Sequence, residues 1–260
     1  MLLSAAAVLF YLIAAAILVR GVARGVDGRA WKLPAALALL EHAWLHIEAW
    51  HRTGVPDMHF FAALSLVSLG MAAVTTLLGA RKRLDAIGVV VFPLAAVFAA
   101  CYSLYGHAPQ PAMSWQVQLH AWLALFAYAT LAVAALLAIV LWLQERAMRN
   151  REFHGWMRAL PPLTELETVL FRTLQIGFLL LTAAILAGVL FVGNLFQQHL
   201  VHKTVLSLLS WLIFAVLLFG RWRWGWRGTR AVRWTLVAMA TLLLAFFGSQ
   251  FVLELILKRT

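Results

Sequence analysis

The sequence has few charged residues and a single cysteine. Only 12% of its 260 residues are charged, which is about half the share found in an average soluble globular domain. The lone Cys101 excludes an internal disulfide framework. Because the chain has no CxxC or CxxCH pair, it cannot exchange dithiols by itself or hold a c-type haem covalently. Polar residues are also too scarce for a disordered chain.

Apolar residues dominate the sequence instead. They make up 64% of the chain, and the mean hydropathy is +0.88. A helix needs roughly 20 apolar residues to cross a bilayer, and backbone groups in lipid must be hydrogen-bonded within the segment. We therefore predict an all-α polytopic membrane protein, a bundle of eight transmembrane helices. The predicted spans are 2–19, 34–50, 59–80, 86–105, 117–143, 173–193, 204–220 and 234–256.

The net charge of +11 is concentrated in short basic clusters between the apolar runs. Of the 21 lysines and arginines, 17 fall in alternate connections, namely 20–33, 81–85, 144–172 and 221–233. Cytoplasmic loops carry such an excess, so both termini are predicted on the outer, periplasmic side. Since Arg20 follows the first run and no basic residue precedes it, we expect no cleavable signal. The clusters fit anionic lipid, and no nucleic-acid partner is expected.

The chain shows no repeat and no low-complexity linker, so we predict a single membrane domain over 1–260. The longest connection, 144–172, has Phe153, Trp156 and Leu160 at helical spacing, which indicates either a short interfacial helix or a surface loop with aromatic anchors. Thr164 and Glu167 have the spacing of a capping box, so a helix is expected to start there and continue into the sixth span.

Eight of the nine histidines fall at mid-membrane or on the outer side of the predicted topology. His120 and His202 each lie within about one helical turn of the outer interface, on helices of the same polarity. The pair is suited to hold haem iron from two axial positions. Lys203 and Arg52 lie at a similar level for the propionates, and aromatic walls are expected from Trp115, Trp122, Tyr102 and Tyr105. Taken singly, each histidine is more often an interfacial side chain hydrated by headgroup water.

The second span carries an unusual polar stripe. His42 and His46 are four residues apart and share one helix face, while Glu41 and Glu48 share a neighbouring one. Charge at this depth is costly, so the stripe is expected to face the bundle interior. Three interpretations stay open: a packing network, an inner haem site lined by His42 and His46, and a proton pathway.

Several short motifs resemble the core of the CcsA/ResC cytochrome c assembly family. They occur in order over about 115–255, and the eight-span layout is similar to the branch of small YpjD-like and HemX-like inner membrane proteins. The motifs are Gln118–Leu131, Leu174–Phe178, His202–Ser207 followed by Trp211, Gly225–Arg230 and Phe247–Ser249.

The resemblance implies a haem-handling scaffold of the bacterial cytoplasmic membrane that binds haem b non-covalently. His120 and His202 occupy the motifs of the family's paired outward histidines, and His42 matches a further intramembrane histidine. The family's tryptophan-rich outer segment is missing, because the connections 106–116 and 194–203 are short. Ligation of haem to apocytochrome c by this chain alone is therefore not expected.

Three functional hypotheses follow from these patterns. The first is a haem-binding and transfer scaffold rather than an enzyme, with cytochrome c assembly or haem-synthesis proteins as partners and a homo-oligomer left open. The second is a non-haem accessory subunit that regulates another membrane protein or haem synthesis through its basic loops. The third is a redox or proton-relay enzyme that uses the stripe of the second span.

Overall fold

The computed structural model describes residues 2–24, 29–81, 84–105, 113–151, 160–191 and 201–248. In these ranges the secondary structure is helical, and they contain no strand. Each of the eight predicted apolar runs forms a helix. The helices are α1 (Leu2–Arg24), α2 (Lys32–Thr53), α3 (Phe60–Arg81), α4 (Gly88–Tyr105), α5 (Trp115–Arg149), α6 (Leu163–Phe191), α7 (Val201–Trp224) and α8 (Gly228–Leu243).

Seven helices in the described ranges are long and apolar enough to cross a membrane, so the chain is a multi-pass membrane protein. The exception is α2, which contains the polar stripe around His42 and His46. Its 22 residues are sufficient in length, at about 1.5 Å per residue. Because of its polar side chains, α2 is less apolar than the other seven helices.

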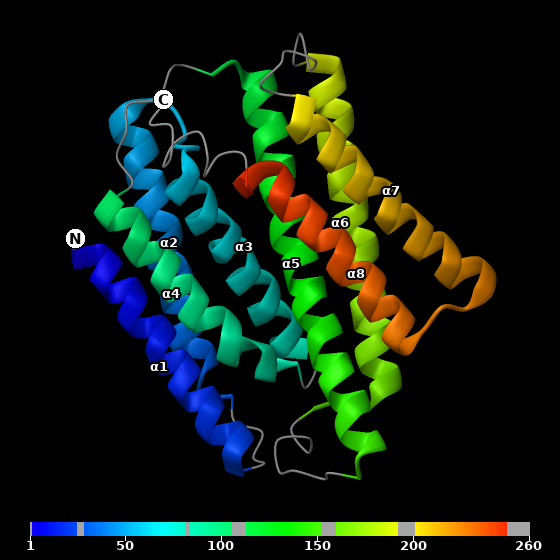
Figure 1. The fold of residues 1–260 in the computed structure, drawn as a ribbon. Coiled ribbons are helices and arrows are strands. Elements are labelled where there is room, and N and C mark those ends of the chain that lie inside the picture. The colour runs from blue at the N-terminus through cyan, green and yellow to red at the C-terminus, as the bar shows by residue number, and fades with distance from the viewer. Residues whose placement is uncertain are drawn as a thin grey trace. The chain divides into compact units, whose positions relative to one another are not determined.

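One compact unit, unit 1, comprises residues 1–112 and 146–165. Its helices α1 to α4 form a closed ring in which α1 contacts α2 and α4, and α3 contacts the same two helices (Figure 1). Trp31, at the start of α2, is 1% exposed and lies beside Gly79 and Phe92. A Cβ at Gly79 would come within 3.0 Å of the indole, so glycine at this position allows the Trp31 side chain to pack against α3.

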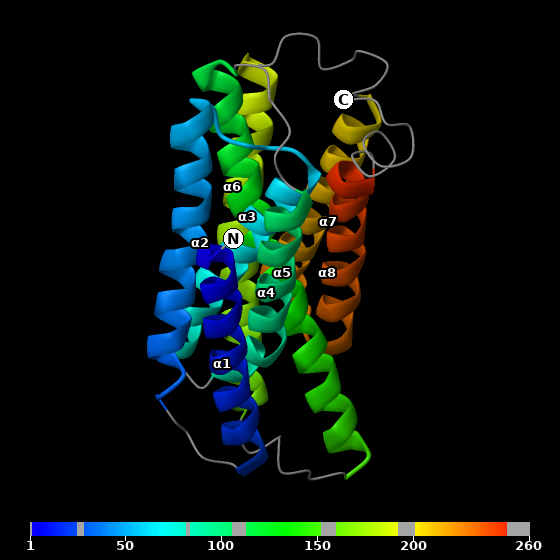
Figure 2. The same ribbon diagram turned by 90° about the vertical axis from the view of Figure 1, so that its left-hand side faces the viewer.

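Unit 2 comprises residues 113–145 and 166–260. Hydrogen bonds join its helices in pairs: Tyr128 of α5 donates to the backbone oxygen of Leu242 of α8 at 2.6 Å, and Trp211 of α7 donates to Thr182 of α6 at 2.9 Å. Figure 2 shows α7 beside α8. Buried polar groups in lipid need such partners, so these bonds fix how the helices face one another.

The turn between α7 and α8 is tied to the other helices of unit 2 by two carboxylates. Glu167 of α6 accepts a hydrogen bond from the backbone nitrogen of Gly228 at 2.9 Å, and Glu145 of α5 accepts one from the Thr229 hydroxyl at 3.1 Å. The helix α6 begins at Leu163, one residue before the expected start at Thr164, so that expectation is confirmed, and the Glu167 carboxylate fastens the turn. The segment of the predicted interfacial helix, 152–159, lies outside the described residues.

Candidate functional site

His120 on α5 is held in one orientation by a hydrogen bond to the neighbouring helix. Its Nδ1 lies 2.7 Å from the backbone oxygen of Ala184 on α6. A carbonyl oxygen only accepts hydrogen bonds, so Nδ1 carries the proton of the neutral ring and Nε2 keeps its lone pair. Histidines that bind metals have this arrangement, in which the second nitrogen donates to a carbonyl or a carboxylate.

Gly188 on α6 makes room for the His120 ring. A Cβ at this position would lie 3.0 Å from Cε1 and 3.1 Å from Nδ1 of the imidazole. The neighbouring Gly177 does the same for Leu131, where a Cβ would come within 2.6 Å. Glycine at these two positions therefore permits close contact between the helices.

His120 lines a cavity of about 310 Å³ inside unit 2. Its walls come from α5 to α8 and from the π-helical turn Leu244–Gly248 that follows α8, and they are mainly apolar, with Leu181, Ile185 and Phe246 among them. The polar groups of the lining include those of His120, Lys203 and Ser207. The Lys203 ammonium lies 5.6 Å from the centre of the Phe246 ring. An apolar chamber with a few convergent polar groups is the usual form of a small-molecule site.

Of the other residues predicted for the outer site, some lie at the cavity and some lie elsewhere. Lys203, in the first turn of α7, lines the cavity with His120, whereas the side chain of the adjacent His202 lies outside the described part. Trp122 is about 200° around α5 from His120 and packs against Phe126 rather than lining the cavity. The remaining members of the predicted set lie elsewhere: Trp115 beside Phe191, and Arg52, Tyr102 and Tyr105 in unit 1.

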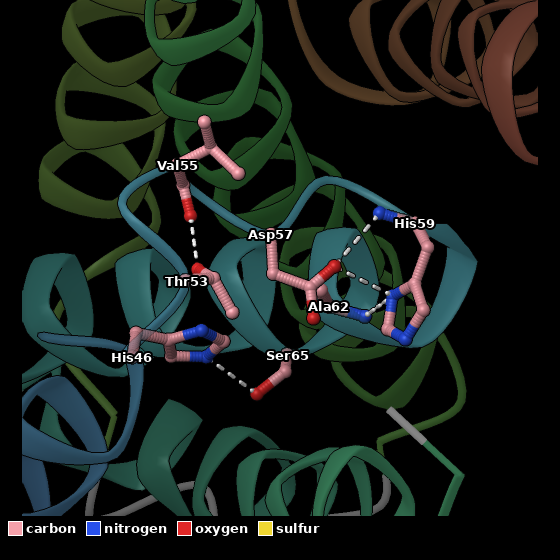
Figure 3. A network of polar contacts seen from close by, with 7 residues as sticks. All are labelled: His46, Thr53, Val55, Asp57, His59, Ala62 and Ser65. Carbon is pink, nitrogen blue, oxygen red and sulfur yellow. Dashed lines mark hydrogen bonds and ion pairs between the residues drawn. The ribbon is translucent and has the colours of Figure 1, made fainter. Parts of the chain in front are cut away.

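The histidines of the second span meet at a serine of α3. The Nε2 atoms of His42 and His46 lie 2.7 Å and 2.9 Å from the Ser65 hydroxyl oxygen, and Figure 3 shows the contact made by His46. On the far side of His42, Nδ1 lies 3.2 Å from the Tyr11 hydroxyl. Both Nε2 atoms are thus occupied by a hydrogen bond, and the inner haem site at these two histidines stays a prediction.

A further histidine, His59, lies where α2 is joined to α3. Figure 3 shows Asp57 turned toward the His59 ring, whose Nδ1 is 3.4 Å from the carboxylate. Nδ1 also accepts a hydrogen bond from the backbone nitrogen of Ala62 at 3.0 Å. His59 is therefore the side-chain cap of α3, a role usually taken by Ser, Thr, Asp or Asn.

The sequence analysis did not identify Tyr11 and Ser65 as partners of the two histidines. It included the carboxylates Glu41 and Glu48 in the polar stripe instead. A single hydroxyl in an apolar run is common and carries little signal, because its depth and facing depend on packing. Glu48 pairs with Arg52 one turn along α2, and the hydrogen-bond partners of His42 and His46 are hydroxyls rather than carboxylates. The signal in the sequence that could have indicated Ser65 is a polar residue of the third predicted span at the depth of His42.

Comparison with known proteins decides the family. The sequence model described as Cytochrome C assembly protein matches residues 30–257. The chain belongs to the cytochrome c assembly protein family. The resemblance in its motifs is therefore confirmed, and His120, Lys203, His42 and Ser65 all lie within the matched range.

Among relatives of this cytochrome c assembly family member, the inner membrane protein YpjD of Escherichia coli is 30% identical over 96% of the chain and 97% of the relative. Protein HemX of Brevibacillus brevis is 26% identical over 50% of the chain and 48% of HemX. The cytochrome c biogenesis protein CcsA of Prochlorococcus marinus is 29% identical over 34% and 28%, respectively. No solved structure matches the chain.

Proposed function

We propose that this family member binds haem b non-covalently in the cavity of unit 2 and hands it on, with His120 as an axial ligand. The observation that carries the proposal is the hydrogen bond from His120 Nδ1 to the Ala184 carbonyl. It leaves Nε2 as the atom with a lone pair, which is what coordination of iron requires.

The other residues of the cavity suit the rest of the haem molecule. Haem is a flat apolar ring with two propionates at one edge, and the lining combines apolar side chains with the ammonium of Lys203. Lys203 would pair with a propionate, and Phe246 would pack against the ring. His202, adjacent to Lys203 in the first turn of α7, is the proposed second axial ligand.

The donor set and the lining therefore fit haem. Bound haem would supply an iron that takes imidazole ligands and one electron, while the protein would contribute the ligand, a cation for the propionate and a mainly apolar chamber. The cavity volume of about 310 Å³ is near the lower end for ligand sites. A site of this kind holds and transfers its ligand, and no catalytic residue is proposed.

An absorption spectrum of the detergent-purified chain tests this proposal. After expression with added haem, the wild type should show a Soret band and give a positive pyridine haemochrome. His120→Ala should lose most of the band or change its spin state. His51→Ala removes an exposed histidine of α2 and serves as the matched control, with an unchanged spectrum. No haem in the wild type, or equal spectra for the two variants, would contradict the proposal.

We propose further that the chain resides in a bacterial inner membrane as one domain with eight spans and both termini outside. The relative YpjD is named an inner membrane protein, and 17 of the 21 basic residues fall on the side predicted to be cytoplasmic. In this arrangement α2 also crosses the membrane and brings the number of spans from seven to eight. Its His42 is fully buried in unit 1, so the bundle shields the most polar part of that helix from lipid.

A further inference from the structure

Four side chains of unit 1 are joined in a line by direct hydrogen bonds. The line begins at Tyr11 on α1, passes through His42 and Ser65, and ends at His46. Tyr11, His42 and Ser65 are completely buried, whereas His46 is half-buried. We propose that these four residues form a proton relay between His46 and the interior of the bundle. This proposal is independent of haem binding in unit 2.

The single proton of the Ser65 hydroxyl fixes the protonation pattern of the two rings. The hydroxyl can donate to only one Nε2, so the other Nε2 must carry a proton and donate to Oγ. When both rings are neutral, His42 and His46 therefore hold opposite tautomers. This coupling follows from the two distances of 2.7 Å and 2.9 Å to the same oxygen.

The line can pass one proton between its two rings. In one arrangement His46 Nε2 donates to Ser65, Ser65 donates to His42 Nε2, and His42 Nδ1 donates to the Tyr11 oxygen. When a proton from the half-buried side joins His46 Nδ1, His46 Nε2 transfers its proton to Ser65, and Ser65 transfers its own to His42 Nε2. The positive charge then lies on His42. The reverse transfers return the proton to His46 Nδ1 and to solvent.

Titratable groups gather at the half-buried end of the relay. The His46 ring stacks on Tyr102 with 4.4 Å between the ring centres, and the His59 ring meets Tyr102 edge-on at 6.1 Å. Asp57 in turn contacts His59. These groups come from α4 and from the connection between α2 and α3, and they surround the half-buried end of the relay. At the other end, the Tyr11 ring stacks on Phe92 inside the bundle.

A packing network would use the same bonds, and exchange with solvent separates the two roles. In a relay, the ring proton of the buried His42 reaches water through Ser65 and His46. Removing the hydroxyl should then slow its exchange, because the proton must wait for the bundle to open locally. If the bonds only stabilise packing, their removal loosens the bundle and speeds the exchange.

The experiment is NMR of the full-length chain labelled with 15N-histidine in lipid nanodiscs, with His42 assigned by His42→Gln. Ser65→Ala should slow exchange of the His42 ring proton by about tenfold. Ser65→Thr keeps the hydroxyl and should retain the wild-type rate. Ser68→Ala is the matched control, since Ser68 is also buried on α3 but donates to the backbone oxygen of Ser65.

Equal or faster exchange in Ser65→Ala would overturn the relay. If Ser65→Ala does not fold, the wild type still tests the relay. Its His42 ring proton should exchange faster than the backbone amide protons of α2 beside it, which need the bundle to open locally, and equal or slower exchange would contradict the proposal. Haem content is not part of either readout, so failure here is distinct from failure of the haem site.

Discussion

The state of His120 is set by one backbone carbonyl. The hydrogen bond to Ala184 fixes both the tautomer and the direction of the ring, and a ligand held in advance loses less conformational entropy when iron binds. The sequence predicted His120 and Lys203 as members of one site, because both lie at the same depth on helices of equal polarity. It could not predict the carbonyl partner, which depends on how α6 packs against α5.

Gly188 gives a test of this positioning that leaves the ligand in place. Gly188→Ala should push the His120 ring away from α6, since the added Cβ would lie 3.0 Å from it. We expect haem affinity to fall by about tenfold, or about 1.4 kcal/mol, as measured by titration of haem into the purified chain. Gly177→Ala is the control: it crowds Leu131 instead, so it should lower thermal stability more than haem affinity. Equal losses of affinity would refute the positioning role.

The helices themselves were well predicted, and their ends less so. Each of the eight apolar runs is a helix, because a backbone in lipid has no alternative within the segment. The helix α6 begins at Leu163, next to the expected start at Thr164, so that end is confirmed, whereas α5 continues to Arg149, beyond the predicted end of its span at 143. Polar residues extend helices beyond the bilayer without contributing to an apolar run. The last part of the eighth predicted span, 249–256, lies outside the described residues.

The turn between α7 and α8 contains two glycines that differ in one respect. Gly225 and Gly228 both have positive φ, at 64° and 53°, but only at Gly228 would a Cβ meet a neighbour, at 2.6 Å from the Glu145 carboxylate. Alanine at either position should cost about 1–2 kcal/mol from backbone strain. Gly228→Ala should cost more, because it also displaces Glu145. Thermal unfolding in detergent measures both, and equal destabilisation would show that the carboxylate is not held by the turn.

The prediction of orientation for the whole chain rests on its basic residues. Four basic clusters alternate with connections that are predicted to be outer and that hold few charges, and this pattern does not change if the helix ends shift by a few residues. By contrast, the cavity of unit 2 is lined by residues from Val117 to Phe246, on helices far apart in the sequence. Spacing along the chain therefore suggested candidate residues for a site but not the shape of the cavity.

Labelling of single cysteines tests the orientation directly. In a Cys101→Ser background, Arg52→Cys should react with a membrane-impermeant maleimide added to intact spheroplasts. Arg227→Cys should react only after the membrane is opened. Both side chains are largely exposed, at 72% and 69%, so access to reagent is comparable. The opposite pattern, or equal labelling of both, would contradict outer termini and an eight-span count.

The central claim, that His120 supplies an imidazole to haem iron in unit 2, is tested most directly by chemical rescue. His120→Gly removes the ring and leaves a space of its shape beside Gly188. We predict that the haem-loaded variant shows an altered Soret band and that added imidazole restores the wild-type spectrum with saturation. The same addition should leave the wild-type spectrum unchanged. A variant whose spectrum already equals that of the wild type without imidazole would contradict the account.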